Sequence, residues 1–387
     1  MILNSLYSLT SRLSAAVIKI IVYLYLAKVL NVIEYGQFSF LMTVNNIGAM
    51  FLLFGINHSV LQVISSIKNI RLKKKIINIS VQYLLLLSIC SFGFITGILS
   101  LIFTFKIGII VGIGISTQII YIMIQSINLA EDKMLRYILL PTTQLVLFFT
   151  LVLAIEIKGS YQVIFLYSIS SLIALLLMKV NTQINIKLSL IVLKRMLSMG
   201  KSHLLNELNN VLIHRSDIII LKLLKLDMLL GFYSIVKNVI EGMLYLPKSL
   251  QPIILRDYNY SKRGIIKTIN LVILLIQILM LIATYIFGEY LIEVFLGKHY
   301  LIVYNILLLY LVGLIFMSIG MINSYKMLSY KYFKETIMLN FLLGIGLLIF
   351  NFIGISFSEE YGIGMSFIIC SFGYYLISIK SLKKEKV

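Results

Sequence analysis

Residues 203–221, HLLNELNNVLIHRSDIIIL, place polar and charged side chains along one side of an otherwise apolar stretch. At the 100° per residue of an α-helix, six of them fall within an arc of about 100°, with Arg215 on its flank. The six are His203, Asn206, Glu207, Asn210, His214 and Asp217. A charge exposed to lipid at mid-membrane costs roughly 2.5–3.5 kcal/mol on insertion scales. If this helix crosses a membrane, its polar face must therefore point into protein or water.

The composition predicts that this helix does cross a membrane. Of the 387 residues, 60% are hydrophobic and only 13% are charged, and the mean hydropathy is +1.00. A spanning helix needs about 20 mostly apolar residues, and lipid offers no hydrogen-bond partner to an open backbone. We therefore predict an all-α polytopic membrane protein with about 12 transmembrane helices. The expected spans are 13–30, 37–61, 77–103, 107–129, 137–156, 161–180, 203–225, 231–255, 267–288, 301–325, 335–355 and 361–380.

The net charge of +19 follows the pattern of a membrane protein rather than that of a nucleic-acid-binding protein. Twenty-four Lys and Arg residues lie at the amino end and in alternate connections, whereas six lie in the remaining connections. By the positive-inside rule, both termini and the basic connections face the cytoplasm. Anionic lipid headgroups are the expected partners of a patch such as KNIRLKKK (68–75), and no nucleic-acid partner is expected.

The domain organisation follows from the connections, none of which is long enough for a soluble domain. The longest one, residues 181–202, mixes apolar and basic residues in a way that suits a helix along the inner surface. We predict an N-terminal six-helix lobe at 1–180, this amphipathic linker at 181–202 and a C-terminal six-helix lobe at 203–387. A faint internal repeat agrees with two lobes, because YGQFSFLMTVNN (35–46) and LGFYSIVKNVIEG (230–242) align Gly36 with Gly231.

The sequence contains no zinc-protease or nucleophile-elbow motif. The GKS at 200–202 is not a phosphate-binding loop, because that loop requires Gly where Arg195 stands. Cys90 and Cys370 both fall in predicted spans, which argues against a disulfide or a metal site. We expect no catalytic residue, no metal and no cofactor.

Two further predicted spans carry polar stripes. In the eighth, Lys237, Glu241, Tyr245 and Lys248 lie within about 80° at helical pitch, and Lys237 and Glu241 have the spacing of an i,i+4 pair. In the first, Arg12, Lys19 and Tyr23 share a face. Together with the seventh span, these residues can line a cavity of mixed sign with a surplus of positive charge.

Several stretches resemble a known family. LAKVLNVIEYGQFSFLMTVNNIGAMFLLFGINHSVLQ (26–62) resembles the amino-terminal signature of polysaccharide repeat-unit flippases. These are the Wzx-type O-antigen and capsule transporters of the multidrug/oligosaccharidyl-lipid/polysaccharide exporter superfamily. RSDIIILKLLKLDMLLGFYSIVKNVIEGMLYLPKSLQPIIL (215–255) resembles the family's Arg-x-Asp helix, Gly-x-Tyr turn and Pro-containing eighth helix, and FGEYLIEVFLGKHY (287–300) and YGIGMSF (361–367) resemble later stretches. The related drug antiporters and lipid II flippases share parts of this likeness.

The resemblance implies two six-helix lobes around a central cavity, alternating access, and a bacterial inner-membrane location. It further implies that the substrate is an undecaprenyl-diphosphate-linked oligosaccharide of O-antigen or related polysaccharide synthesis, moved from the cytoplasmic to the outer leaflet. Membrane lipids and other polysaccharide-assembly proteins are the implied partners. A diphosphate requires cationic groups, and sugars require Asn, Tyr and Ser. Flipping needs no covalent chemistry, so the protein is not expected to be an enzyme.

The expected site residues follow from the same resemblance. The substrate-binding candidates are Arg215, Lys237, Lys19, Asn210, Arg12 and Lys248. The candidates for balancing these charges, or for binding a coupling H⁺ or Na⁺, are Asp217, Glu207 and Glu241.

A structural interpretation stands beside each of these functional ones. Lys237–Glu241 and Arg215–Asp217 could form an ion-pair network that clamps the seventh and eighth spans together. Arg12 and Lys248, near span ends, could extend their charges towards the interface. His214 could be a packed, hydrogen-bonded histidine rather than a proton sensor.

Two other functions remain open. A cation-coupled drug or metabolite antiporter of the same superfamily should favour an anionic, aromatic cavity, against which the in-span cations count. A membrane oligosaccharide polymerase or glycosyltransferase must present catalytic groups on an outer surface, where SFSEEYG (356–362) offers Glu359 and Glu360.

Overall fold

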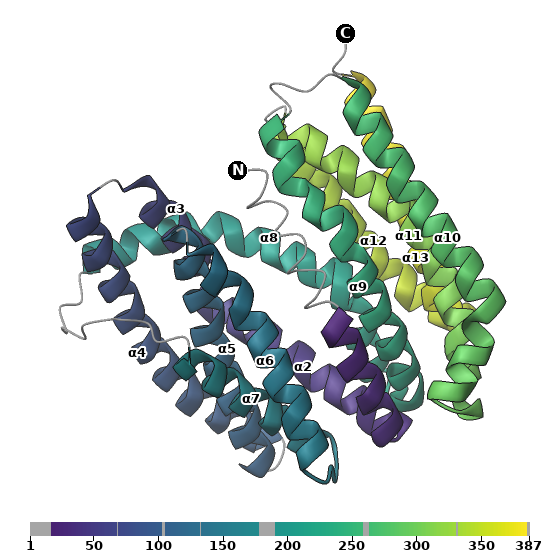
Figure 1. Ribbon diagram of the computed structural model, residues 1–387, viewed down its shortest axis with the longest axis horizontal. Coiled ribbons are helices and arrows are strands. Elements are labelled where there is room, and N and C mark those ends of the chain that lie inside the picture. The colour runs from purple at the N-terminus through teal and green to yellow at the C-terminus, as the bar shows by residue number, and fades with distance from the viewer. Residues whose placement is uncertain are drawn as a thin grey trace. The chain divides into compact units, whose positions relative to one another are not determined.

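The computed structural model describes residues 17–67, 69–102, 105–131, 133–177, 190–257, 263–329 and 332–384. Within these ranges the regular structure is helical throughout, and none of them contains a β-strand (Figure 1). The predicted fold class, an all-α polytopic membrane protein, is confirmed.

The helices follow the predicted spans closely. The first span appears as a helix over residues 17–29. The others are α2 (Val32–Leu53), α3 (Ile56–Ser66), α4 (Ile70–Ile102), α5 (Phe105–Ala130), α6 (Met134–Ala154), α7 (Ser160–Leu177), α8 (Leu190–Leu223), α9 (Asp227–Asp257), α10 (Arg263–Phe295), α11 (Leu301–Ser329), α12 (Phe333–Phe357) and α13 (Gly362–Lys384), with a short 3-10 turn η1 (Lys298–Tyr300) before α11.

The second predicted span is broken into α2 and α3, which meet at an angle of 55°. The break lies at Phe54 and Gly55, whose φ angles of 47° and 70° are left-handed. A left-handed residue ends a helix, and glycine adopts that conformation without steric cost. Eight helices of the described chain are long and apolar enough to cross a membrane, or nine with this bent pair. Helices α8 and α9 are not among the eight, which agrees with their polar faces.

The chain forms two compact units. Unit 1 comprises Met1–Gln37 and Asn209–Val387, and unit 2 comprises Phe38–Leu208. The sequence suggests two lobes joined by a linker at 181–202, and residues 181–189 of that linker lie outside the described ranges. Residues 190–202 form the beginning of α8, which continues without a break. The chain thus passes from one unit to the other inside α2 and inside α8.

Unit 2 is built around α5, which packs against α3, α4, α6 and α7. The buried side chains Ile115, Ile119 and Met123 of α5 belong to its main apolar cluster. Lipid is as apolar as these side chains, so close packing and interhelical hydrogen bonds must hold the helices together. One such bond joins α6 to α7, where the amide of Gln144 donates to Ser171 Oγ at 2.6 Å.

Unit 1 is built around α11, which packs against α9, α10, α12 and α13. Its helices are joined by buried polar bonds, such as the one from Asn323 Nδ2 to Ser378 Oγ at 3.0 Å. Helices α12 and α13 approach to backbone contact at Gly354 and Gly362, where a Cβ added to Gly362 would lie 1.9 Å from the Gly354 carbonyl oxygen.

This close approach gives a stability prediction. We expect Gly362→Ala to destabilise the protein by about 1–3 kcal/mol, because overpacking forces the two backbones apart. The measurement is thermal unfolding of the purified protein in detergent. Gly373→Ala is the matched control, since it lies on the same helix and its Cβ would meet nothing within 4 Å. Equal stability of the two variants would contradict the proposed packing role of Gly362.

Candidate functional site

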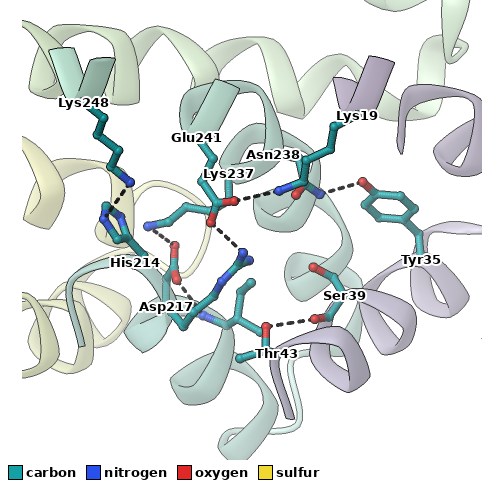
Figure 2. Close-up of polar contacts among 12 residues, drawn as sticks. Lys19, Tyr35, Ser39, Thr43, His214, Asp217, Lys237, Asn238, Glu241 and Lys248 are labelled. Carbon is teal, nitrogen blue, oxygen red and sulfur yellow. Dashed lines mark hydrogen bonds and ion pairs between the residues drawn. The ribbon is translucent and has the colours of Figure 1, made fainter. Parts of the chain in front are cut away.

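A cluster of charged side chains in unit 1 brings together the first helix and two consecutive helices, α8 and α9, that lie far from it in sequence. The helix over residues 17–29 supplies Lys19, α8 supplies Arg215 and Asp217, and α9 supplies Lys237 and Glu241. Figure 2 shows Lys19, Asp217, Lys237 and Glu241 directed toward a common region of this unit. We call these five residues, together with Lys248 and His214, the charged cluster.

Glu241 is the centre of the first half of the cluster. It accepts from Arg215 at 2.7 Å through Oε1 and from Lys19 at 3.1 Å through Oε2 (Figure 2). The side chains of all three retain between 12% and 22% of their exposure. One carboxylate thus links α8, α9 and the first helix.

Glycine explains how the first helix comes close enough to reach Glu241. A Cβ added to the neighbouring Gly242 would lie 2.5 Å from Ile20 Cδ1, so the absence of a side chain permits the approach. The same helix is held at its other end by Tyr300, whose hydroxyl donates to the carbonyl of Ala27 at 2.7 Å. These contacts place Lys19 one residue away from the packing position, beside the carboxylate.

Asp217 is the centre of the second half. Lys237 Nζ lies 2.9 Å from Asp217 Oδ2, and the hydroxyl of Tyr310 donates to the same oxygen at 3.0 Å. Both partners of this ion pair are buried, with exposures of 5% for the Lys237 side chain and 1% for that of Asp217. The ammonium also lies 5.4 Å from the ring centre of Tyr310 and 5.7 Å from that of Phe367, within cation–π range.

The ion pairs differ from those anticipated from sequence. Neither Lys237–Glu241 nor Arg215–Asp217 forms; instead, Asp217 pairs with Lys237 and Arg215 pairs with Glu241. Residues two apart on a helix do not face each other, so Arg215 and Asp217 reach different partners. Those partners lie one turn apart on α9, and each binds the opposite charge on α8. Two ion pairs therefore join α8 to α9, but each charge pairs with a residue of the other helix and not with one of its own helix.

Lys248 and His214 complete the cluster. Lys248 Nζ lies 3.4 Å from His214 Nε2, so the ammonium can donate to a neutral imidazole (Figure 2). Among the described residues, no carboxylate is within ion-pair distance of Lys248. Counting the described residues of the cluster, four cations face two carboxylates, which leaves two positive charges in excess.

The other predicted site residues lie elsewhere. The side chain of Asn210 is exposed and takes no part in the contacts of the cluster. Glu207 belongs to unit 2, where it lies 3.0 Å from His58. Arg12 is outside the described residues.

The structure also adds residues that the sequence did not single out. Tyr310 and Phe367, from α11 and α13, stack at 4.7 Å and cover Lys237. Asn238 donates to the hydroxyl of buried Tyr35 at 2.9 Å (Figure 2). Aromatic residues make up 12% of the sequence, so no local signal separates these from the rest.

The internal repeat has a structural counterpart. A Cβ added to Gly36 would lie 2.9 Å from the backbone nitrogen of Gly231, and one added to Gly231 would lie 2.2 Å from the carbonyl oxygen of Val32. The two glycines aligned from sequence therefore pack against each other, near the beginnings of α2 and α9.

Comparison with known proteins finds its matches among solved structures. No protein-family model matches the sequence, and no curated protein sequence matches it either. The chain is similar to the lipid II flippase MurJ in an inward closed conformation, with a TM-score of 0.77 and 13% identity over 99% of this chain and 88% of that one.

Two multidrug transporters are also similar. One is an inward-facing MATE family transporter of the MOP superfamily, with a TM-score of 0.69 and 13% identity over 95% of this chain and 100% of that chain. The other is the MATE multidrug transporter DinF-BH, with a TM-score of 0.66 and 13% identity over 99% of this chain and 94% of that chain. The chain is thus a multi-pass membrane protein with the fold of MOP-superfamily transporters.

Proposed function

We propose that this protein is a flippase that moves undecaprenyl-diphosphate-linked oligosaccharide repeat units, of O-antigen or a related polysaccharide, from the cytoplasmic to the outer leaflet. It binds the headgroup at the inner face, changes conformation by alternating access and releases the headgroup outside. The polyprenyl tail stays in lipid throughout. No bond is made or broken, so the cycle requires binding groups and no catalytic residue.

The observation that carries this proposal is the excess of two positive charges in the charged cluster. An isolated cation within a membrane is costly unless an anion or water accompanies it. Asp217 already compensates Lys237, and Glu241 offers one negative charge to Lys19 and Arg215. The two remaining positive charges match a diphosphate, which carries about two negative charges when esterified at both ends, and Arg and Lys are the side chains that bind phosphate oxygens.

The cations of the cluster differ in their surroundings, and we propose different roles for them. Lys19 and Arg215 retain 22% and 18% of their side-chain exposure, and Lys248 contacts only a neutral ring within the cluster. Lys237 is held by Asp217 beneath two aromatic rings. We therefore assign diphosphate binding to Arg215, Lys19 and Lys248, and assign to Lys237 the ordering of α8 against α9.

The membrane topology supports the same direction of transport. The basic connections predict cytoplasmic termini in the bacterial inner membrane, the side on which lipid-linked repeat units are assembled before export. The partners that this function requires are the lipid-linked oligosaccharide, the surrounding lipids and the proteins that assemble the polysaccharide.

The test is the fate of lipid-linked oligosaccharide in cells without this protein. We expect intact single repeat units to accumulate on the cytoplasmic leaflet, where an impermeant glycan-modifying enzyme added outside cannot reach them. Supplying the wild-type gene should restore their arrival outside. Single units that reach the outer leaflet but remain unpolymerised would instead indicate a polymerase.

A drug antiporter is the second candidate, because two of the similar structures are multidrug transporters. The surplus of positive charge in the cluster disfavours cationic drugs. Drug sensitivity of the same deletion strain, with no change in lipid-linked oligosaccharide, would favour this candidate over the flippase.

A further inference from the structure

A second polar cluster lies in unit 2 and is separate from the residues to which we assign diphosphate binding. His58 and Gln62 come from α3, and His203 and Glu207 come from α8. His58 Nε2 lies 3.0 Å from Glu207 Oε1, and Gln62 Nε2 lies 3.2 Å from His203 Nε2. The two imidazole rings stack with their centres 4.9 Å apart and an angle of 27° between their planes. We call these four residues the histidine cluster.

Glycine brings the two helices together at this point. A Cβ added to Gly55 would lie 2.3 Å from the carbonyl oxygen of Gly200, and one added to Gly200 would lie 2.4 Å from the carbonyl oxygen of Phe54. On both helices the cluster residues follow the glycine at the same spacing, three and seven positions later. Residues at that spacing share one helix face, so the glycine contact aligns both polar pairs.

The chemistry of the cluster suits a proton better than any other cation. Alkali ions are hard cations that take oxygen ligands, whereas this cluster presents two imidazoles and a single carboxylate. Within the described ranges, no group of three His, Cys, Asp or Glu side chains is arranged to hold a metal ion. Histidine is the side chain that exchanges a proton between pH 5 and 8.

The geometry favours one added positive charge in the cluster over two. Glu207 lies at hydrogen-bond distance from His58 and stabilises a positive charge there. A second proton on His203 would place two imidazolium rings face to face, and Gln62 can donate to the nitrogen that this proton would occupy. The titratable groups that act on His203 are His58 and Glu207. The side chains of His58 and Glu207 keep 36% and 34% exposure, so the cluster is not sealed inside the protein.

We propose that the histidine cluster is a proton-binding site and that its proton couples the transport cycle to the proton gradient. The coupling part rests on the proposed flippase function. The link between the sites is helix α8 itself, which carries His203 and Glu207 in unit 2 and then Arg215 and Asp217 in unit 1. Protonation changes the charge balance between α3 and α8, and a shift of α8 moves the residues that hold the diphosphate.

The first experiment needs no substrate. Proton uptake by the purified full-length protein in lipid nanodiscs is measured with an indicator dye between pH 8 and pH 5.5. We expect the wild type to take up about one more proton per chain than the double variant H58Q/H203Q. A difference of about two protons would mean independent histidines, and no difference would mean that the cluster does not titrate; either result overturns the proposal.

Single-residue variants test the same cluster with a smaller change to the protein, in case the double variant misfolds. E207Q removes the negative charge that favours proton binding, so it should shift the uptake toward lower pH. E156Q is the matched control, because Glu156 is an exposed acid of the same unit outside the cluster. Gel filtration confirms that each variant is folded. Identical uptake curves for E207Q and E156Q would contradict the role of Glu207.

The second experiment tests coupling in cells. Arrival of repeat units at the outer leaflet is measured with the proton gradient intact and after an ionophore exchanges protons for K⁺. We expect collapse of the gradient to slow the wild type at least tenfold and to have little effect on the residual rate of E207Q. If the wild type flips equally fast without the gradient, coupling is excluded. If deletion causes no accumulation of lipid-linked units, the flippase proposal fails, while the uptake measurement still decides whether the cluster binds a proton.

Discussion

Replacing Asp217 with Ala lowers the stability of the protein by about 3–5 kcal/mol, the typical cost of removing one partner from a buried ion pair. The physical reason is the charge that remains. Lys237 has 5% exposure, and its ammonium would lie beside the stacked rings of Tyr310 and Phe367 without a carboxylate. The hydroxyl of Tyr310 would lose its acceptor as well. Thermal and denaturant unfolding in detergent measure the change.

A double-mutant cycle separates the ion pair from simple loss of packing. Adding Lys237→Met to Asp217→Leu removes both charges and keeps apolar volume, so we expect the double variant to recover most of the stability. Glu335→Gln is the control, because Glu335 is exposed in the same unit and should change stability by about 0.5 kcal/mol or less. If Asp217→Ala unfolds no more easily than Glu335→Gln, the buried pair does not order α8 against α9.

Replacing Lys248 with Gln reduces flipping about tenfold or more while leaving stability nearly unchanged. Lys248 has no carboxylate partner among the described residues, so its removal leaves no anion unpaired. It does remove one of the two surplus positive charges. A hydrogen bond to a charged group contributes about 1.5–3 kcal/mol, equivalent to a factor of roughly 10 to 100 in binding. The arrival rate of repeat units at the outer leaflet measures the effect.

Two further variants make this prediction specific. Lys298→Gln is the matched control, since it removes the same charge from an exposed side chain of unit 1 and should leave flipping unchanged. Lys248→Arg keeps the charge and should retain most of the activity. Normal flipping by Lys248→Gln would exclude Lys248 from the diphosphate site and would favour a structural role for its contact with His214.

Spacing within one helix is enough to single out, from the sequence alone, several residues of the two clusters. His203, Glu207, Arg215 and Asp217 were recognised because a polar residue is conspicuous in an apolar stretch, and the surplus of positive charge follows from counting. The sequence did not predict the ion pairs, because the partner of each charge lies on a second helix. The i,i+4 spacing favoured Lys237 with Glu241, but each found a stronger partner of opposite charge on α8.

The histidine cluster is a second case in which the sequence does not predict a contact between two helices. His203 and Glu207 lie in the polar stretch of α8, whereas His58 and Gln62 lie about 145 positions earlier in a different helix. Nothing near His58 in sequence distinguishes it from a packed histidine. Its significance comes from the contact of Gly55 with Gly200, which no local pattern predicts.

The sequence by itself determined the fold class, the positions of the helices and the sign of the charge in the candidate site. These properties are local or additive, because hydropathy over about 20 residues decides whether a helix can cross a membrane and charge is a sum over residues. Only the tertiary structure decided which charges pair, which cations keep surplus charge and which histidines meet. Those contacts join residues far apart along the chain, and they depend on glycine positions that allow two backbones to approach.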